Sequence, residues 1–395
     1  MPRPAFEVAD ALRRHGDACR ARNAGQLDRS ALRVMGAIEA CRTAALGGHV
    51  ARCGDCGHTA ISYNSCRNRH CGKCQGGAAR EWLEARAADL LPVEYFHAVF
   101  TLPAPVAAIA FQNKALVYAI LFEAAAATLK TIAADRKYLG AGTGATMVLH
   151  TWGQTLTHHP HVHCIVPGGG LAPDGETWVA CRPGFFLPVR VLSRLYRRLF
   201  LEKLAAVRRA GKLRFFNDLA PLADGKAFAA HLAPLRRSEW IVFAKKPFAG
   251  PEQVLTYLSR YTHRIAIANR RLVAIDGTHV AFTWRDYAHG GVQKIMRLDT
   301  HEFIRRFLLH VLPDGFQRIR HYGFLANGHR KGKLAVIRKL LAATPPISSP
   351  PSGDDAQAAA ADGQATPCPC CGGPMTIIEF LPGPRRRRTP RIDTS

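Results

Sequence analysis

The alternation of apolar and polar residues along the chain predicts a series of strands and helices. Short apolar or alternating runs bounded by Pro or Gly are typical of strands, and they occur at residues 96–102, 145–152, 161–166 and 240–244. Residues 271–284 alternate around Asp276-Gly277, which is a strong hairpin signal. Apolar residues at helical spacing predict helices at 1–40, 78–90, 105–136, 188–211, 252–261, 301–312 and 332–342.

Shifts in composition divide these elements into three parts. Residues 1–91 predict a small helical, zinc-binding domain, because Cys, Gly and His are frequent in its second half and large apolar residues are too few to fold it alone. Residues 92–342 predict one α+β domain. From residue 343 on, the Pro- and Ala-rich composition predicts a disordered basic tail that contains the motif Cys368-Pro-Cys-Cys.

The charge of the chain narrows the class of partner. Its 395 residues include 54 Lys and Arg but only 29 Asp and Glu, a formal net charge of +25 at pH 7. Such a surface attracts polyanions. Anionic membranes compete as partners, but Lys114, Glu123 and Lys130 interrupt the Ala-rich stretch, so we expect no membrane-spanning helix. The first residues lack the apolar core of a secretory signal, and we expect a cytoplasmic protein.

Cysteine pairs predict a structural zinc site in the N-terminal part. Thiols stay reduced in the cytoplasm, so the chain's twelve cysteines indicate metal binding before disulfides. Cys53 and Cys56 form one C-x2-C pair, and Cys71 and Cys74 form another after residues 57–70. This spacing is typical of four thiolates around one tetrahedral zinc ion. The alternative is four unrelated free thiols.

Other potential ligands lie close to these pairs and in the tail. A second zinc ion is a candidate for Cys41, His49, Cys66 and His70, which are otherwise core or surface residues. Four polar residues of this unit are either DNA contacts or ordinary solvated groups: Arg67, Asn68, Arg69 and Lys73. In the tail, Cys368 and Cys371 form half a zinc ribbon with Cys370 between them. The pair either binds a metal across a dimer, binds nothing, or is a remnant.

Histidines in one predicted strand form a candidate catalytic metal site. His161 and His163 are two residues apart, so their side chains lie on the same face of a strand. His150 and Gln154 precede them at alternating positions and could face the same site. We expect Mg²⁺ or Mn²⁺ here, with Gln154 as an oxygen ligand. His158 and His159 are rivals for that third place, and the alternative is a set of buried, hydrogen-bonded histidines.

A pair of tyrosines supplies candidate nucleophiles. Tyr257 and Tyr261 are four residues apart, so they share one face of a helix. Neighbouring basic residues could hold phosphates beside them and lower their pKa; these are Arg260, His263, Arg264, Arg270 and Arg271. On its own, such a pair is more often a packing stripe than a catalytic motif.

Taken together, these motifs resemble a known family. The chain is similar to the two-tyrosine rolling-circle transposases of the Insertion Sequence 91-like group, within the HUH endonuclease superfamily. The resemblance extends from about Cys41 to Leu341. Its motifs are Gly48–Cys56, Asn64–Gln75, Phe100–Pro103, Thr151–Gln154, His159–His163, Tyr257–Arg271 and His321–Asn327.

The resemblance implies a fold and a chemistry. The implied fold is an antiparallel sheet of four or five strands flanked by helices and preceded by the zinc-binding domain. The implied reaction nicks single-stranded transposon ends and attaches the 5′ phosphate to tyrosine, with Tyr257 and Tyr261 as nucleophiles. His161 and His163 would bind the metal ion, beside the strand Phe100–Pro103. A bacterial, nucleoid-associated protein is implied.

Several readings of the same residues remain open. The sequence holds no G-x4-G-K-[ST] loop, so we expect unwinding to come from a host helicase, the replication machinery or DNA topology. Within the same chemistry, a rolling-circle replication initiator or relaxase is the alternative. A non-catalytic, zinc-dependent DNA-binding regulator is the alternative of another class. Aromatic stacking platforms for bases are candidates at Trp152, Tyr196, Trp284 and Tyr287.

Overall fold

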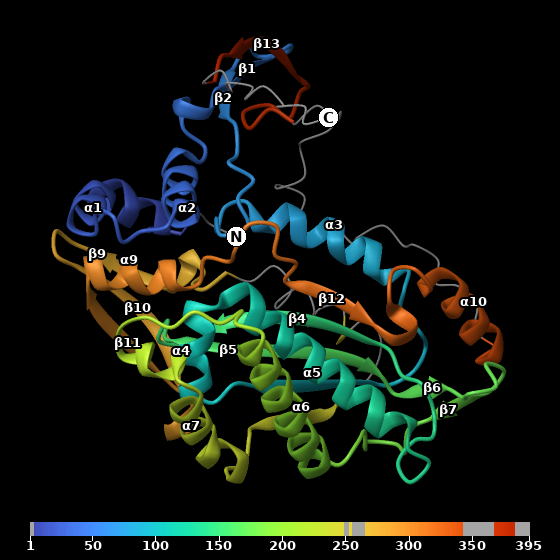
Figure 1. The fold of residues 1–395 in the computed structure, drawn as a ribbon. Helices are drawn as coiled ribbons and strands as arrows, with labels where there is room; N and C mark the ends of the chain where they lie inside the picture. The colour runs from blue at the N-terminus through green and yellow to red at the C-terminus, as the bar shows by residue number, and fades with distance from the viewer. Residues whose placement is uncertain (1–3, 249–252, 255–264, 343–366, 384–395) are drawn as a thin grey trace, which may run out of the picture.

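The fold was obtained from a computed structural model that describes residues 4–248, 253–254, 265–342 and 367–383. Within these ranges the chain is an α+β protein with antiparallel sheets (Figure 1). The predicted fold class is therefore confirmed. The predicted tyrosine helix at 252–261 lies outside the described residues, apart from 253–254.

The N-terminal segment forms two helices, α1 (Val8–Arg22) and α2 (Arg29–Ala40). The sequence predicted one helical stretch here, and the structure divides it. Glu7 and Asp10 form a capping box at the start of α1, and Asp28 caps α2 by accepting a hydrogen bond from the Ala31 N–H at 2.6 Å. The helices pack against each other through their buried faces and share a hydrophobic core with α9 (Thr300–Leu309).

A three-stranded sheet stands beyond these helices, at the top of Figure 1, in the order β13-β1-β2. Its strands are β1 (Gly48–Cys53), β2 (Thr59–Tyr63) and β13 (Met375–Leu381). All pairings are antiparallel. The prediction of a disordered tail is therefore wrong for residues 367–383. The apolar run Met375-Thr-Ile-Ile-Glu-Phe-Leu381 pairs with β1 because its residues favour a strand.

The central sheet has five strands in the order β12-β4-β5-β3-β8, all antiparallel. They are β3 (Tyr95–Thr101), β4 (Ala145–Trp152), β5 (His158–Pro167), β8 (Val242–Phe248) and β12 (Ile319–Tyr322). The sequence predicted the first four of these, with β4 at its observed bounds and the ends of the others displaced by one to four residues. The five-stranded antiparallel sheet that the resemblance implies is confirmed.

One face of this sheet is apolar and covered by helices (Figure 1). Side chains alternate along strands, so Phe96, Ala98 and Phe100 of β3 point to the same side as Val162 and Cys164 of β5. The helices over this face are α4 (Ala104–Gln112), α5 (Lys114–Ala134), α6 (Val189–Arg209) and α7 (Gly225–Arg237). Together they bury the largest hydrophobic core in the described residues.

Helix α5 is the central helix of that core. By length and composition it could cross a membrane, so the expectation that charged residues exclude such a segment is wrong. However, 56% of its most apolar window is buried inside the protein. Val117, Leu121 and Ala125 are fully buried among the core residues. Its hydrophobicity therefore reflects its packing against the sheet.

The remaining elements surround the central sheet. The predicted hairpin at Asp276-Gly277 is confirmed, and a third strand that the sequence analysis did not predict extends it. These strands are β9 (Leu272–Ile275), β10 (His279–Asp286) and β11 (Val292–Asp299). The other elements are α3 (Gln75–Ala87), β6 (Gly169–Leu171), β7 (Trp178–Ala180) and α10 (Arg330–Leu340), with short 3-10 helices at 44–46, 217–223, 269–271, 287–289 and 323–325.

Candidate active site and metal centres

The second face of the central sheet carries a group of three histidines. His150 of β4 lies directly opposite His161 of β5, and His163 follows on the same face of β5. Each offers one ring nitrogen, and these three atoms lie within 4.8 Å of one another. His150 and His163 are buried, whereas His161 is half-buried. The arrangement offers three neutral nitrogen ligands to one divalent cation, with His161 nearest to solvent.

Hydrogen bonds determine which ring nitrogen His161 and His163 of β5 can offer to a metal ion. His161 Nδ1 lies 2.7 Å from the carbonyl oxygen of His159, so Nδ1 carries a proton and donates it. His163 Nδ1 lies 2.8 Å from Nε2 of His97, a buried residue of β3. In both rings Nε2 is therefore the nitrogen available to a metal ion. The sequence analysis did not single out His97, although it alternates with Tyr95 and Val99 along β3 and therefore shares one face of the strand with them.

The other candidates for the third ligand lie elsewhere. His158 Nε2 is 2.8 Å from the hydroxyl of buried Tyr118, and burial lowers the pKa of His158 to about 4. His159 is exposed and belongs to no such group within the described residues. Gln154 lies in the turn between β4 and β5, where its backbone oxygen accepts a hydrogen bond from Arg271. His150 is the third histidine of the group, and a ligand role for Gln154 stays a prediction.

Tyr257 and Tyr261 lie outside the described residues, but the chain on either side of them is placed. Val254 is fully buried beside Tyr95 and Ile165, and Ile165 is on the histidine face of β5, two residues after His163. On the other side, Ala266 and Ile267 are buried in the core shared with α1 and α9. Val254, the last described residue before Tyr257, therefore lies on the histidine face of the sheet.

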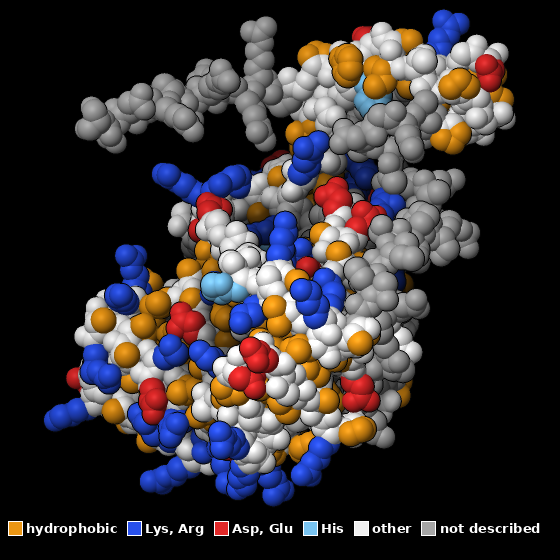
Figure 2. Space-filling model, turned by 90° about the vertical axis from the view of Figure 1, so that its right-hand side faces the viewer, with side chains coloured by type: hydrophobic (Ala, Val, Ile, Leu, Met, Phe, Trp, Pro, Cys, Tyr) orange, Lys and Arg blue, Asp and Glu red, His pale blue; other side chains and the backbone are white. Residues whose placement is uncertain are grey.

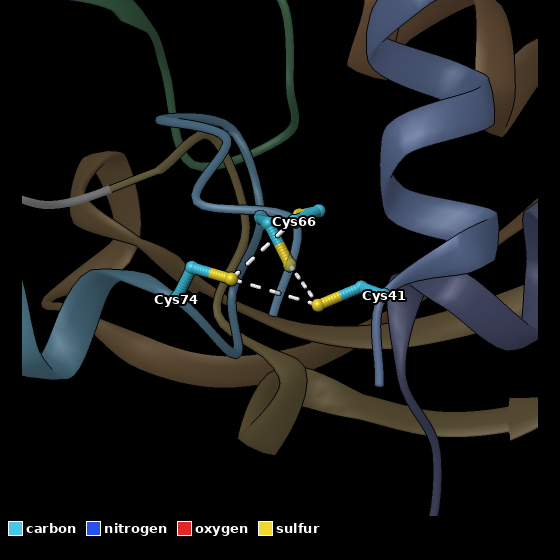
Figure 3. A group of neighbouring side chains, drawn as sticks. Cys41, Cys66 and Cys74 are labelled. Carbon is cyan, nitrogen blue, oxygen red and sulfur yellow. Dashed lines mark hydrogen bonds between the residues drawn. The ribbon is translucent and has the colours of Figure 1, made fainter. Parts of the chain in front are cut away.

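Four cysteines at the base of the N-terminal unit converge on one point. Figure 3 shows Cys41 at the end of α2, Cys74 at the start of α3 and Cys66 from the loop between them pointing toward one another. The Sγ atoms of Cys41 and Cys74 are 3.5 Å apart, and those of Cys66 and Cys74 are 3.6 Å apart. Cys71 completes the group, 3.6 Å from Cys41. Four thiols so placed match the ligand set of a structural zinc ion.

A second group of four cysteines lies at the far end of the three-stranded sheet. It consists of Cys53, Cys56, Cys368 and Cys371, whose Sγ atoms also lie within 4.8 Å of one another. The predicted grouping of Cys53 and Cys56 with Cys71 and Cys74 is therefore wrong. The β1–β2 hairpin has five paired positions, so Cys53 and Cys56 at its tip lie about 17 Å from its base. Cys71 and Cys74 lie at the base, in the first group.

His49 and His70 belong to neither group within the described residues, so their predicted pairing with Cys41 and Cys66 is also wrong. His49 lies on β1, four residues and about 13 Å from Cys53. His70 Nε2 accepts a hydrogen bond from the Leu312 N–H, and burial lowers the pKa of His70 to about 3. Its ring is therefore a neutral internal acceptor.

Two of the basic residues considered as DNA contacts form hydrogen bonds or an ion pair within the protein. Arg69 donates hydrogen bonds to the carbonyl oxygens of Phe316 and Pro313. Lys73 forms a buried ion pair with Glu7 at 2.5 Å. The contacts of Arg69 join the N-terminal unit to the part of the chain after residue 92, whereas the Lys73–Glu7 pair lies within the N-terminal unit.

Comparison with known proteins agrees with this arrangement. Residues 11–102 match the IS91-type family "Transposase zinc-binding domain", and residues 144–333 match the family "Putative transposase". The chain is 58% identical over 97% of its length, and 97% of the relative's, to "Putative transposase y4qJ" of Sinorhizobium fredii. It is 29% identical over 73% of its length, and 68% of the relative's, to "Transposase for insertion sequence element IS801" of Pseudomonas savastanoi pv. phaseolicola. The chain therefore belongs to the IS91 family of transposases.

Proposed function

We propose that this transposase nicks and rejoins single-stranded transposon ends through a covalent bond between a tyrosine and the 5′ phosphate of the DNA. The observation that carries the proposal is the group of His150, His161 and His163 on the histidine face of the central sheet. Its second support is Val254, which is buried on that face three residues before Tyr257.

The histidine group suits a divalent ion. Both β5 histidines direct Nε2 to the site because Nδ1 is hydrogen-bonded to His159 or His97. A divalent ion bound there would polarise the scissile phosphate and offset the charge that develops on it. Imidazole nitrogens suit transition metals better than Mg²⁺, which prefers oxygen ligands. Of the two expected metals, we therefore favour Mn²⁺.

The tyrosine hydroxyl attacks phosphorus, and the bond to the 3′ oxygen breaks. The product is a 5′ phosphotyrosine and a free 3′ hydroxyl, so the phosphodiester energy is conserved and no nucleotide needs to be hydrolysed. Attack by a 3′ hydroxyl reverses the step and joins strands. Two tyrosines, Tyr257 and Tyr261, would allow two ends to be held in turn. A host helicase or the replication machinery would supply the single strand.

A covalent-adduct assay tests the nucleophiles. Labelled single-stranded transposon ends are incubated with the full chain and Mn²⁺, and the protein–DNA adduct is measured on a denaturing gel. We expect the adduct to disappear in Tyr257→Phe combined with Tyr261→Phe, because the attacking oxygen is lost. Tyr63→Phe, at an exposed tyrosine of β2, is the control and should match the wild type. An undiminished adduct in the double variant would rule out both nucleophiles.

The same assay tests the metal site. His161→Ala removes a proposed ligand and should reduce the adduct to background, whereas His159→Ala changes an exposed neighbour on the same strand and should retain it. Binding of the oligonucleotide should persist in both variants. If wild-type protein binds the ends but never forms an adduct with any divalent metal, a non-catalytic DNA-binding regulator explains the chain better.

A further inference from the structure

We propose that Cys53, Cys56, Cys368 and Cys371 bind a second zinc ion, in a site built from the two ends of a single chain. The N-terminal zinc-binding domain match ends at residue 102, so it contains only half of these ligands. The other half lies beyond the catalytic domain. The site thus adds a structural metal centre to the one formed by Cys41, Cys66, Cys71 and Cys74.

The spacing of the sulfur atoms fits a tetrahedral ion. Cys53 Sγ lies 3.5 Å from Cys371 Sγ, and Cys56 Sγ lies 3.6 Å from Cys368 Sγ. Zn–S bonds of about 2.3 Å place the corners of a tetrahedron about 3.8 Å apart. A disulfide needs about 2.05 Å, and all four residues are free thiols. The same spacing occurs in the first cysteine group, where the closest pair is also 3.5 Å apart.

The two halves of the site repeat one backbone structure. Each has the sequence C-x2-C-G, Cys53-Gly-Asp-Cys-Gly57 and Cys368-Pro-Cys-Cys-Gly372. In each, the N–H of the glycine donates to the carbonyl oxygen of the first cysteine, at 3.2 and 2.9 Å. Gly57 and Gly372 have φ of 71° and 79°, which other residues rarely adopt. The pair Cys71-Gly-Lys-Cys-Gln75 lacks this final glycine.

Further contacts hold the two halves together around the thiols. Antiparallel pairing of β1 with β13 places Met375 opposite Cys53, and the Gly54 N–H donates to the Pro374 carbonyl oxygen at 3.2 Å. Cys53, Cys368 and Met375 are buried together. The Cys370 N–H donates to Cys368 Sγ at 3.4 Å, a hydrogen bond that favours the thiolate form. Cys370 itself is exposed and outside the group of four.

Zinc content of purified full-length variants tests the site. Cys368→Ser with Cys371→Ser should lose about one zinc ion per chain relative to wild type, and so should Cys53→Ser with Cys56→Ser. Combining all four substitutions should lose about one ion and not two, because both pairs serve the same site. Cys370→Ser is the matched control and should lose none. An unchanged zinc content in the Cys368 and Cys371 variant, or a loss of two ions in the combined variant, would overturn the proposal.

Alkylation of the wild-type protein tests the site without any substitution. With zinc bound, N-ethylmaleimide should modify Cys370 rapidly, while Cys53, Cys56, Cys368 and Cys371 should stay protected until a chelator is added. Mass spectrometry of the peptides reads out each position. Rapid modification of Cys368 and Cys371 in zinc-loaded protein would contradict the site.

Mixing the two double variants tests whether all four ligands come from one chain. Recovery of a zinc ion in the mixture would show that the ligands come from two chains and would overturn a site within one.

Discussion

At the scale of single residues, the histidine site depends on a partner that contributes no ligand. We infer that His97 is a positioning residue: it lies on β3 with its Nε2 2.8 Å from His163 Nδ1, and the planes of the two rings are nearly parallel, with 7° between them. For His163 to present Nε2 to a metal ion, its Nδ1 must carry the proton and donate it to His97. The bond therefore fixes both the tautomer and the direction of the ligand ring.

Removing that bond should weaken metal binding more than it weakens the fold. In His97→Phe the ring shape is kept but the acceptor is lost, and we expect the Mn²⁺ affinity to fall by roughly 10- to 100-fold. His97→Gln can still accept the hydrogen bond and should restore most of the affinity. Calorimetric titration with Mn²⁺ measures this without DNA. Equal Mn²⁺ affinity in His97→Phe and the wild type would show that His97 has no positioning role.

At the scale of elements, most of the central sheet could be predicted from alternation. The strand at Ala145–Trp152 was predicted at its observed bounds, since β-branched and apolar residues there end at Gly153. Its partner strand begins three residues earlier than predicted, at His158, because the polar histidines pair with β4 even though they break the apolar run. Strand β12 was missed because Ile319-Arg-His-Tyr322 has no apolar signal of its own.

The cysteine grouping could not be predicted from spacing. Two C-x2-C pairs separated by fourteen residues are equally consistent with one site and with halves of two sites. Only the glycine after the second cysteine distinguishes Cys53–Cys56 from Cys71–Cys74, and it relates the first pair to Cys368–Cys371 instead. The overall composition of the tail concealed the strand Met375–Leu381, whose own residues favour pairing.

The four candidate stacking residues differ in how far the surrounding elements bury them. Tyr196 of α6 is fully buried, with its ring 5.0 Å from Phe100 and 5.4 Å from Trp240. Tyr287, in the turn between β10 and β11, is 70% exposed. Tyr196 is therefore a core residue, whereas Tyr287 is free to stack on a base. Trp152 and Trp284 are only partly buried and pack against the N-terminal core.

Alanine substitutions should separate these two roles. Tyr196→Ala should lower the free energy of unfolding by about 3–5 kcal/mol, because it leaves a large cavity. Tyr287→Ala should leave that free energy within about 0.5 kcal/mol but weaken binding of single-stranded DNA by about 1–3 kcal/mol. Urea denaturation and fluorescence anisotropy measure the two quantities. Wild-type DNA affinity in Tyr287→Ala would remove this residue from the binding surface.

At the scale of the whole molecule, positive charge is unevenly distributed over the face that Figure 2 shows. Figure 2 shows Lys and Arg side chains spread over the main body, whereas the small lobe at its top has mostly uncharged and hydrophobic groups on the face in view. Binding of the DNA backbone is therefore expected on the body. The arginines at 385–388 lie outside the described residues, and their sequence adds four positive charges near the end of the chain.

Salt dependence tests the contribution of these arginines. Each phosphate neutralised on a single strand contributes about −0.7 to the slope of log affinity against log salt. Changing the four arginines at 385–388 to glutamine should reduce the magnitude of that slope by up to about 3, while the position of the nick stays the same. An unchanged slope would show that the run does not contact DNA. Arg52→Gln, at an exposed arginine of β1 in the small lobe, is a control of the same residue type.

The sheet that joins β1 to β13 has a consequence for synthesis of the protein. Cys56 and Cys368 are 312 residues apart, and ribosomes add about 5–20 residues per second. Strands β1 and β2 are therefore translated roughly 15 to 60 s before β13, the third strand of their sheet. Until then β1 presents an unpaired edge, which is prone to pairing with other chains. A chain that ends before residue 367 would lack β13 and would leave that edge of β1 unpaired.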